Sequence, residues 1–199
     1  MKIYSKMILA VVLLLTATTI SAQNMPVRIG LKGGLNISDI GGDVHNTDVK
    51  FGGIIGVTAD FRVASQWYIL GALELTTKGA EVDYDWYNGA SNVKINAVYL
   101  QTPVHIGYKF NVGKGISIMP HAGSYFALGI GGKTKWSGNK NDTFTDVLER
   151  FDFGLGTGGS VEFSNNIVLD LKYDFSLLDV GSHAELRNSV LYLTAGYKF

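Results

Sequence analysis

The sequence contains no cysteine and only three prolines among its 199 residues. The absence of cysteine excludes a disulfide framework, a thiolate metal site and a lipid-modified cysteine at an export cleavage site. Charged residues are also scarce, at 17% of the chain, where about a quarter is usual. Basic and acidic residues number 17 each, so the net charge gives no reason to expect a nucleic-acid partner.

Glycine and aromatic residues are abundant, with 25 glycines and 12% aromatic side chains. Together with so little proline, this composition favours a glycine-rich β protein over a helical one. The length is sufficient for one domain of ordinary size.

The first 22 residues have the pattern of a secretory signal peptide. Two lysines near the start precede a short apolar run at residues 7–15, and residues 20–22 form a small-x-small cleavage pattern. The run is shorter than the roughly 20 residues of a membrane-spanning helix, although an uncleaved anchor helix is the alternative. We predict a signal peptide at residues 1–22 and one exported domain at residues 23–199. Cleavage would remove both lysines and leave 15 basic against 17 acidic residues, a charge near −2.

After residue 22 no segment has a sustained apolar period of 3.6 residues. Eight stretches instead alternate with a period of two, which predicts strands with two unlike faces. These stretches are residues 27–37, 51–63, 67–79, 93–110, 116–130, 150–163, 167–177 and 189–199. In the fourth, Ile95 and Tyr99 have one parity on the apolar face and Val104 and Ile106 have the other, so we expect a bulge at Pro103.

The connections between these stretches alternate in length. Tight turns are expected at residues 63–66, 111–114 and 164–166, and longer polar loops at residues 38–50, 80–92, 131–149 and 179–188. Short turns at one end and long loops at the other are typical of an outer-membrane barrel. We therefore predict an eight-stranded antiparallel up-and-down transmembrane β-barrel with a porin-like fold. Its loops would face outside the cell, and its turns and both termini would lie in the periplasm.

Three features predict that the apolar faces meet lipid. They carry no charge, and an eight-stranded barrel is too narrow to hold so many large side chains. The opposite faces mix charges with glycines, which suit a crowded interior. Aromatic residues also gather near the strand ends, as in the interfacial girdles of membrane barrels. They are Phe61, Tyr108, Phe110, Phe163, Tyr197 and Phe199 at the turn end, and Phe51, Tyr99 and Phe151 toward the loop end.

The polar faces predict a lumen filled with paired charges, a salt-bridged plug rather than a channel. The basic members are Arg28, Lys32, Arg62, Lys78, Lys94, Lys109, Arg150, Lys172 and Lys198. The acidic members are Asp60, Glu74, Asp152, Glu162, Asp170 and Asp174. His105 and His121 face this lumen on adjacent strands, about opposite one another. Such a pair could bind a metal or respond to pH, but with no carboxylate or third ligand visible beside it we favour a hydrogen-bonded pair.

Two other motifs are weak evidence for a nucleotide-binding or calcium-binding site. Residues 154–159 match G-x-G-x-x-G, but they lie inside a strand, whereas a dinucleotide loop requires a following helix. Asp83, Asp85 and Asn88 resemble a calcium loop, yet Asn96 falls near the place of the required glutamate. The sequence therefore predicts no catalytic, cofactor-binding or metal-binding residue and no cofactor.

Several short motifs resemble a known family. They are Gly30-Leu31-Lys32-Gly33-Gly34-Leu35-Asn36, Tyr99-Leu100-Gln101-Thr102-Pro103, Gly107-Tyr108-Lys109-Phe110 and Leu193-Thr194-Ala195-Gly196-Tyr197-Lys198-Phe199. Together they resemble the outer-membrane β-barrel domain of Bacteroidota labelled PorT-like, over residues 27–199. The resemblance implies the fold and an outer-membrane location. A named member of that family acts in protein secretion, but no motif here indicates that role.

We expect a structural or interaction role without catalysis. The expected partners are outer-membrane lipid, the outer-membrane assembly machinery through the terminal Phe199, and a protein at the loops, where Trp86, Tyr87 and Trp136 lie. One alternative is a lipid-modifying enzyme using a serine and a histidine at the rim; the candidates are His45 and His183, with Ser38 and Ser182 near them in sequence. The other alternative is a soluble periplasmic lipocalin-like carrier, which requires the apolar faces to point inward.

Overall fold

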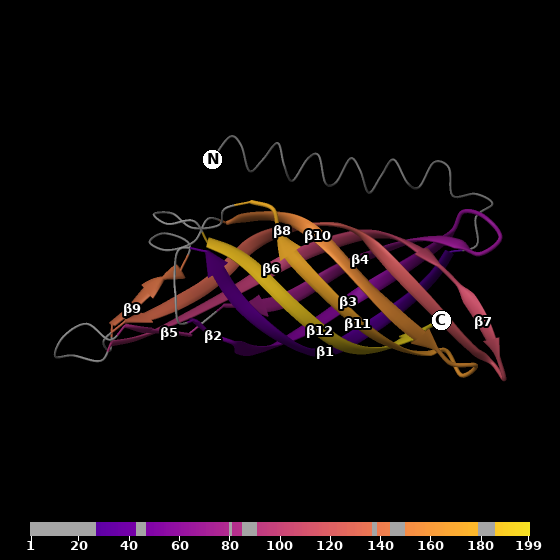
Figure 1. Cartoon of the computed structure of the whole chain (residues 1–199), viewed down its shortest axis with the longest axis horizontal. Helices are drawn as coiled ribbons and strands as arrows, with labels where there is room; N and C mark the ends of the chain where they lie inside the picture. Colours follow the sequence, from indigo (N-terminus) through magenta and orange to yellow (C-terminus); the bar gives the residue numbers. More distant parts are fainter. Residues whose placement is uncertain are drawn as a thin grey trace.

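The computed structural model describes residues 27–42, 47–79, 81–84, 91–136, 139–143, 150–178 and 186–199. Eight long strands form its body (Figure 1). They are β1 (Val27–Gly42), β3 (Lys50–Arg62), β4 (Trp67–Lys78), β6 (Ser91–Tyr108), β8 (Ile116–Trp136), β10 (Phe151–Glu162), β11 (Ile167–Ser176) and β12 (Leu186–Lys198). Each pairs antiparallel with the next long strand, and β1 pairs with β12, which closes the barrel. The predicted eight-stranded barrel is confirmed. In the described part of the chain no helix is long and apolar enough to cross a membrane.

The tight turns lie together at one end of the barrel, called here the turn end, where β12 also finishes (Figure 1). The β6–β8 connection differs from the predicted turn, because β7 (Phe110–Gly113) pairs with the start of β8 and lengthens the hairpin. Its tip is built from Gly113, Lys114 and Gly115, all with positive φ (97°, 54° and 75°). Two glycines there provide the left-handed backbone that this tip requires.

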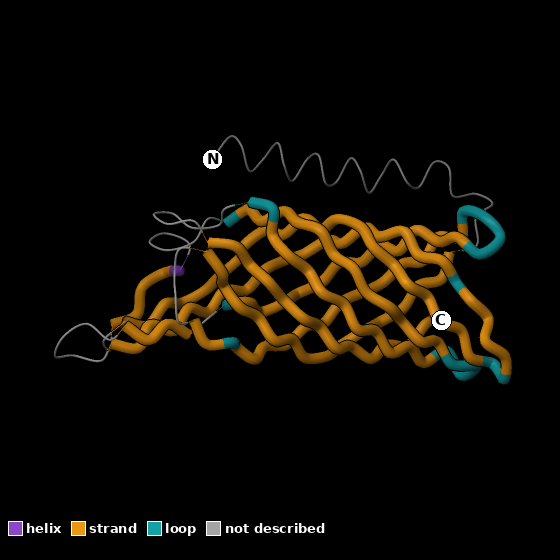
Figure 2. Tube along the Cα trace, viewed as in Figure 1, coloured by secondary structure: helices purple, strands orange, loops and turns teal. Residues whose placement is uncertain are grey.

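The strands run further at the opposite end, called here the loop end, than the alternation predicts. β8 continues to Trp136 and pairs with β9 (Asn139–Asp142), while β5 (Glu81–Tyr84) pairs with both β6 and β2 (Thr47–Asp48). Figure 2 shows this ribbon projecting past the barrel wall. The predicted loops at residues 80–92 and 131–149 are thus partly strand. The sequences of β5 and β9, Glu-Val-Asp-Tyr and Asn-Lys-Asn-Asp, have no extended alternation of apolar and polar residues, so the pattern did not predict these strands.

The outward and inward faces match the prediction. Leu171 and Leu193 are 52% and 61% exposed on the outside, whereas Asp152 and Lys172 are 0% and 3% exposed inside. Other large apolar side chains share the outer surface, among them Leu31, Leu35, Phe51, Ile55, Val57, Leu73, Ile106, Phe126, Leu169 and Tyr173. The soluble carrier required the reverse arrangement, so that alternative is wrong.

The fourth predicted strand differs from its expected phase. Ile95, Tyr99 and His105 all point inward, so β6 has one continuous parity and Pro103 causes no change of phase. The irregularity lies in the pairing of β6 with β8, between Val98 and Tyr99. The placement of Ile95 and Tyr99 on the lipid face is wrong, because at this level inward aromatic rings cover buried charges. The ring of Tyr99, for example, lies 5.0 Å from Nζ of Lys78.

The predicted aromatic girdle at the turn end is present on the outer surface. Phe199 and Phe110 are 70% and 50% exposed. Their rings contact neighbouring aromatics, with centroid distances of 5.5 Å to Tyr197 and 4.6 Å to Tyr108 respectively. Trp67, which was not among the predicted girdle residues, adds an exposed ring. At the loop end Phe51 is exposed as predicted, whereas Tyr99 is buried in the interior and is not part of the girdle.

Candidate functional site in the barrel interior

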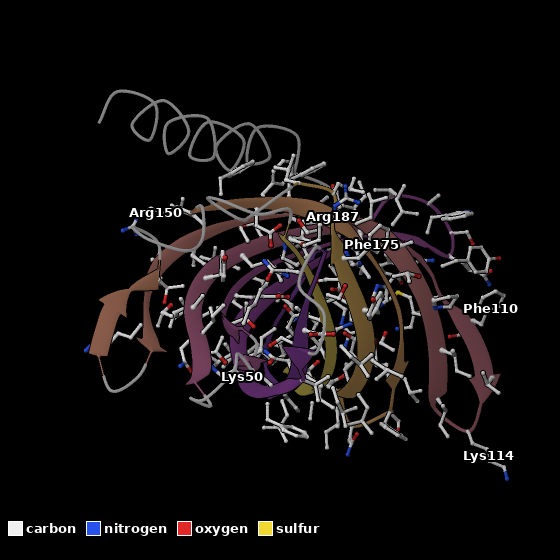
Figure 3. The ribbon with its side chains drawn as sticks, turned by 60° about the vertical axis from the view of Figure 1, so that its left-hand side comes forward. Lys50, Phe110, Lys114, Arg150, Phe175 and Arg187 are labelled. Carbon is white, nitrogen blue, oxygen red and sulfur yellow. The ribbon has the colours of Figure 1, made fainter. Side chains whose placement is uncertain are left out.

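Three charged clusters fill the lumen, and the side chains in Figure 3 show nitrogen and oxygen atoms gathered inside the ribbon. The cluster nearest the loop end surrounds Asp152, which is fully buried. Its carboxylate lies 3.1 Å from Nζ of Lys78, and it accepts hydrogen bonds from Ser176 (2.7 Å), Asn188 (3.0 Å) and Tyr125 (3.3 Å). Donors from four strands therefore converge on this carboxylate.

The middle cluster contains two carboxylates that share one lysine. Nζ of Lys172 lies 3.0 Å from Asp174 and 3.4 Å from Glu74. Lys32 lies 2.6 Å from the other oxygen of Glu74, and Gln101 donates to Asp174 at 2.8 Å. This cluster spans the lumen, because its members come from β1, β4, β6 and β11.

The third cluster closes the turn end. Glu162 pairs with Arg28 (2.5 Å), Lys109 (3.0 Å) and Lys198 (3.5 Å), and Lys198 also pairs with Asp60. A pocket of about 390 Å³ at this mouth is lined by residues of the same cluster, including Arg28 and Glu162. The cluster therefore separates the lumen from this pocket.

All six predicted lumen carboxylates have a basic or imidazole partner, so the predicted pairing is confirmed. Of the remaining basic residues, Arg150 donates to the carbonyl of Gly129. The predicted lumen position of Arg62 is wrong, because Arg62 ends β3, is exposed and donates to the carbonyl of Ser65 in the following turn. The side chain of Lys94 lies outside the described residues. Removing one partner of a buried pair costs about 3–5 kcal/mol, so the clusters also tie neighbouring strands together.

The predicted histidine pair lies beside the middle cluster. Nδ1 of His105 is 2.9 Å from Nδ1 of His121, and both rings are buried. Nε2 of His121 is 2.8 Å from Oδ1 of Asp170. The expectation that no carboxylate lies beside the pair is therefore wrong. Because a carboxylate accepts, Nε2 of His121 carries a proton, and in the neutral ring its Nδ1 accepts from His105.

The G-x-G-x-x-G motif lies within β10, as predicted, and the alternate glycines Gly154, Gly156 and Gly158 make room for inward rings. A Cβ at Gly154 would lie 2.6 Å from the ring of Tyr125, and one at Gly158 would lie 2.8 Å from the ring of His121. A Cβ at Gly156 would lie 3.0 Å from His105. The alternate glycines thus form a strip against which three inward rings pack.

A cavity of about 80 Å³ lies between the middle and turn-end clusters. Its walls include Leu70, Met119 and Val168 as well as both histidines and Asp170. Eight strands leave an interior just wide enough for side chains, and this cavity is far smaller than the roughly 300–1,000 Å³ of small-molecule sites.

Most of the remaining residues singled out in the sequence lie outside the part of the chain that the structure describes. His45, Asp85, Trp86, Tyr87, Asn88, Ser182 and His183 lie outside the described residues, as do the side chains of Asp83 and Trp136. Ser38 is buried and donates to the carbonyl of Gly79 at 2.8 Å. Within the described ranges no three His, Cys, Asp or Glu side chains gather in a way that could hold a metal ion.

The fold is shared with solved bacterial outer-membrane proteins. Neisserial surface protein A is 14% identical over 86% of this chain and 97% of its own, with a TM-score of 0.51. OprG from Pseudomonas aeruginosa is 13% identical over 88% and 97%, with a TM-score of 0.50. A major outer membrane protein from Thermus thermophilus is 14% identical over 87% and 99%, also at 0.50.

These identities are low enough that the similarities concern the fold alone. No curated protein sequence matches the chain. The sequence profile of the "outer membrane protein beta-barrel domain" family matches residues 21–181. That match covers the described barrel from β1 to β11, and β12, which carries Asn188 and Lys198, lies beyond it. The chain therefore belongs to the outer membrane protein beta-barrel domain family.

Proposed function

We propose that this outer-membrane barrel has a structural or interaction role, without catalysis, and that the ribbon and loops at its loop end form the contact surface. One observation carries the proposal: three clusters of buried ion pairs cross the lumen, leaving a cavity of only about 80 Å³. Such an interior offers no room for passage of a nutrient-sized solute. The parts of the molecule open to a partner are then its two ends.

The loop end is the better candidate for contact with a macromolecule. There β5, β6, β8 and β9 extend the wall beyond the barrel, and the outer edges of β2 and β9 carry no further strand within the described residues. In the sequence Trp86 and Tyr87 follow β5, and Trp136 is the last residue of β8. Aromatic side chains are enriched at protein interfaces.

We further propose that residues 1–22 direct export and are removed, and that the loop end faces outside the cell. The terminal Phe199 is proposed to be recognised by the outer-membrane assembly machinery. The support is the signal-peptide pattern and the exposed lipid-side position of Phe199. The narrower kinship with the Bacteroidota PorT-like group rests on the short motifs quoted above. No observation favours a lipid-modifying enzyme, whose candidate histidines lie outside the described residues.

Two experiments test the role. A photoreactive amino acid at position 86 in intact cells should give a discrete cross-linked protein, and the same probe at Ser65 in a turn should not give that product. The proposal fails if both positions give the same products or if position 86 gives none. In planar bilayers the folded protein should show no stable conductance, and a steady open pore would contradict the closed lumen.

A further inference from the structure

Two imidazole nitrogens converge on one point beside the lumen cavity. The Nδ1 atoms of His105 on β6 and His121 on β8 are 2.9 Å apart, and the two ring centroids are 5.1 Å apart. One proton between them satisfies the contact in the structure. The neutral imidazole nitrogen is also the commonest metal ligand in proteins.

His121 is oriented in the manner of a metal ligand. Its outer nitrogen, Nε2, lies 2.8 Å from the carboxylate of Asp170, which fixes the tautomer and leaves the Nδ1 lone pair facing His105. Metal-binding histidines almost always donate their second ring N–H to such a partner, which orients the ring and increases its basicity.

His105 has an equivalent carboxylate close to its outer nitrogen. Nε2 of His105 and Oδ1 of Asp174 are both buried without a hydrogen-bond partner. They lie 3.0 and 2.4 Å from the position that a Cβ at Gly156 would occupy, so the missing side chain of Gly156 leaves them facing the same space. If the ring proton of His105 moves from Nδ1 to Nε2, it can be donated toward Asp174, and the Nδ1 lone pair becomes available. Both histidines then have a carboxylate behind them and a free nitrogen in front.

The surroundings favour a soft ion of single charge. Met119 lines the same cavity as both histidines, and a thioether ligand selects Cu⁺ over harder ions. Among the described residues Glu74 and Asp174 pair with Lys32 and Lys172, and Asp170 pairs with His121. When both histidines are neutral, these three carboxylates and two lysines carry one net negative charge, which one bound positive charge would balance.

We propose that His105 and His121, with Met119 as a third donor, bind a single soft univalent cation, Cu⁺ or its redox-inert analogue Ag⁺. Asp170 and Asp174 position the two rings. This site does not depend on the proposed partner at the loop end. The absence of a side chain at Gly156 in β10 leaves the space in which His105 and Asp174 face each other.

The test measures bound metal in the whole folded protein. The protein is folded with Ag⁺, or with Cu⁺ under ascorbate, then desalted, and its metal is counted by mass spectrometry. The expected content is one ion per chain, falling to background in His105→Gln/His121→Gln. His45→Gln/His183→Gln alters the other two histidines of the chain and should keep one ion. A heat-modifiable gel shift checks that each variant is folded.

Two gentler variants keep the test decisive if the double histidine variant does not fold. Asp170→Asn retains both rings and should weaken Ag⁺ affinity by about 10–100-fold. Met119→Leu conserves volume and should reduce the preference for Ag⁺ over Zn²⁺. The proposal is overturned if the wild-type protein retains no ion, if the ion survives loss of both lumen histidines, or if neither gentler variant changes affinity. The pair is then a hydrogen-bonded contact only.

Discussion

The carboxylate of Asp152 on β10 lies 3.1 Å from the ammonium of Lys78 on β4, with both side chains fully excluded from solvent. The two residues are 74 positions apart in the sequence. The rings of Tyr99 and Tyr125 cover the lysine, at 5.0 and 4.6 Å from its Nζ. The pair therefore joins opposite parts of the barrel wall across a sealed interior.

Loss of one member of this pair should be far more damaging than loss of both. We predict that Lys78→Met lowers the free energy of unfolding by about 3–5 kcal/mol, because Asp152 is left charged and buried. Lys78→Met/Asp152→Leu should recover much of that loss. Urea titration of the barrel in lipid vesicles measures both values. Equal destabilisation by the single and double variants would show that the Lys78–Asp152 contact is not the cause.

Neighbouring glycines of β10 should differ sharply in their tolerance of a methyl group. Gly158→Ala places a Cβ 2.5 Å from the carbonyl oxygen of Leu171 and 2.8 Å from the ring of His121, whereas a Cβ at Gly159 meets nothing within 4 Å. We predict that Gly158→Ala destabilises by about 1–3 kcal/mol, as overpacking does, and that Gly159→Ala is neutral or stabilising. The unfolding midpoints of the two variants in the same detergent compare them directly. A neutral Gly158→Ala would contradict the packed glycine strip.

A charge on the outer surface should cost most near the middle of the barrel wall. Leu193 is 61% exposed within β12, and Val63 is 44% exposed beside a turn. We predict that Leu193→Arg destabilises the membrane-embedded barrel by about 2–4 kcal/mol, and Val63→Arg by about 0–1 kcal/mol. Folding titrations in vesicles measure the difference. Equal costs would mean that Leu193 does not face hydrocarbon.

The inward position of Tyr99 gives a matched pair of aromatic truncations. Tyr99 is fully buried over Lys78, and Phe51 is 73% exposed on the outer surface. We predict that Tyr99→Ala costs about 3–5 kcal/mol, as aromatic-to-alanine changes in cores do, and that Phe51→Ala costs less. The same vesicle assay applies. A larger loss of stability from Phe51→Ala than from Tyr99→Ala would indicate that Tyr99 faces lipid and not the lumen.

Alternation was sufficient to predict the eight long strands, their lipid and lumen faces and the six lumen carboxylates, because a period of two is imposed wherever one face meets hydrocarbon. It failed at Tyr99, where an apolar ring lies inside to cover a lysine. It also failed at β5 and β9, whose short, mostly polar sequences have no extended alternation. The contact between His121 and Asp170 could not be predicted, since Asp170 pairs directly with Ser160 and approaches His121 only through the register of β8, β10 and β11.

The central claim is that the apolar face of each strand meets lipid while the charged face fills the lumen. Because the chain has no cysteine, single spin labels at Leu35, Ile55, Leu171 and Leu193 can report the environment of the outer surface in bilayers, with Ser65 in a turn as the aqueous control. We predict that the four labels collide readily with dissolved oxygen and rarely with a water-soluble nickel complex, the reverse of Ser65. Two results would contradict this claim. In the first, the four labels collide with the nickel complex as often as the label at Ser65 does. In the second, they are shielded from both reagents, as in a protein core.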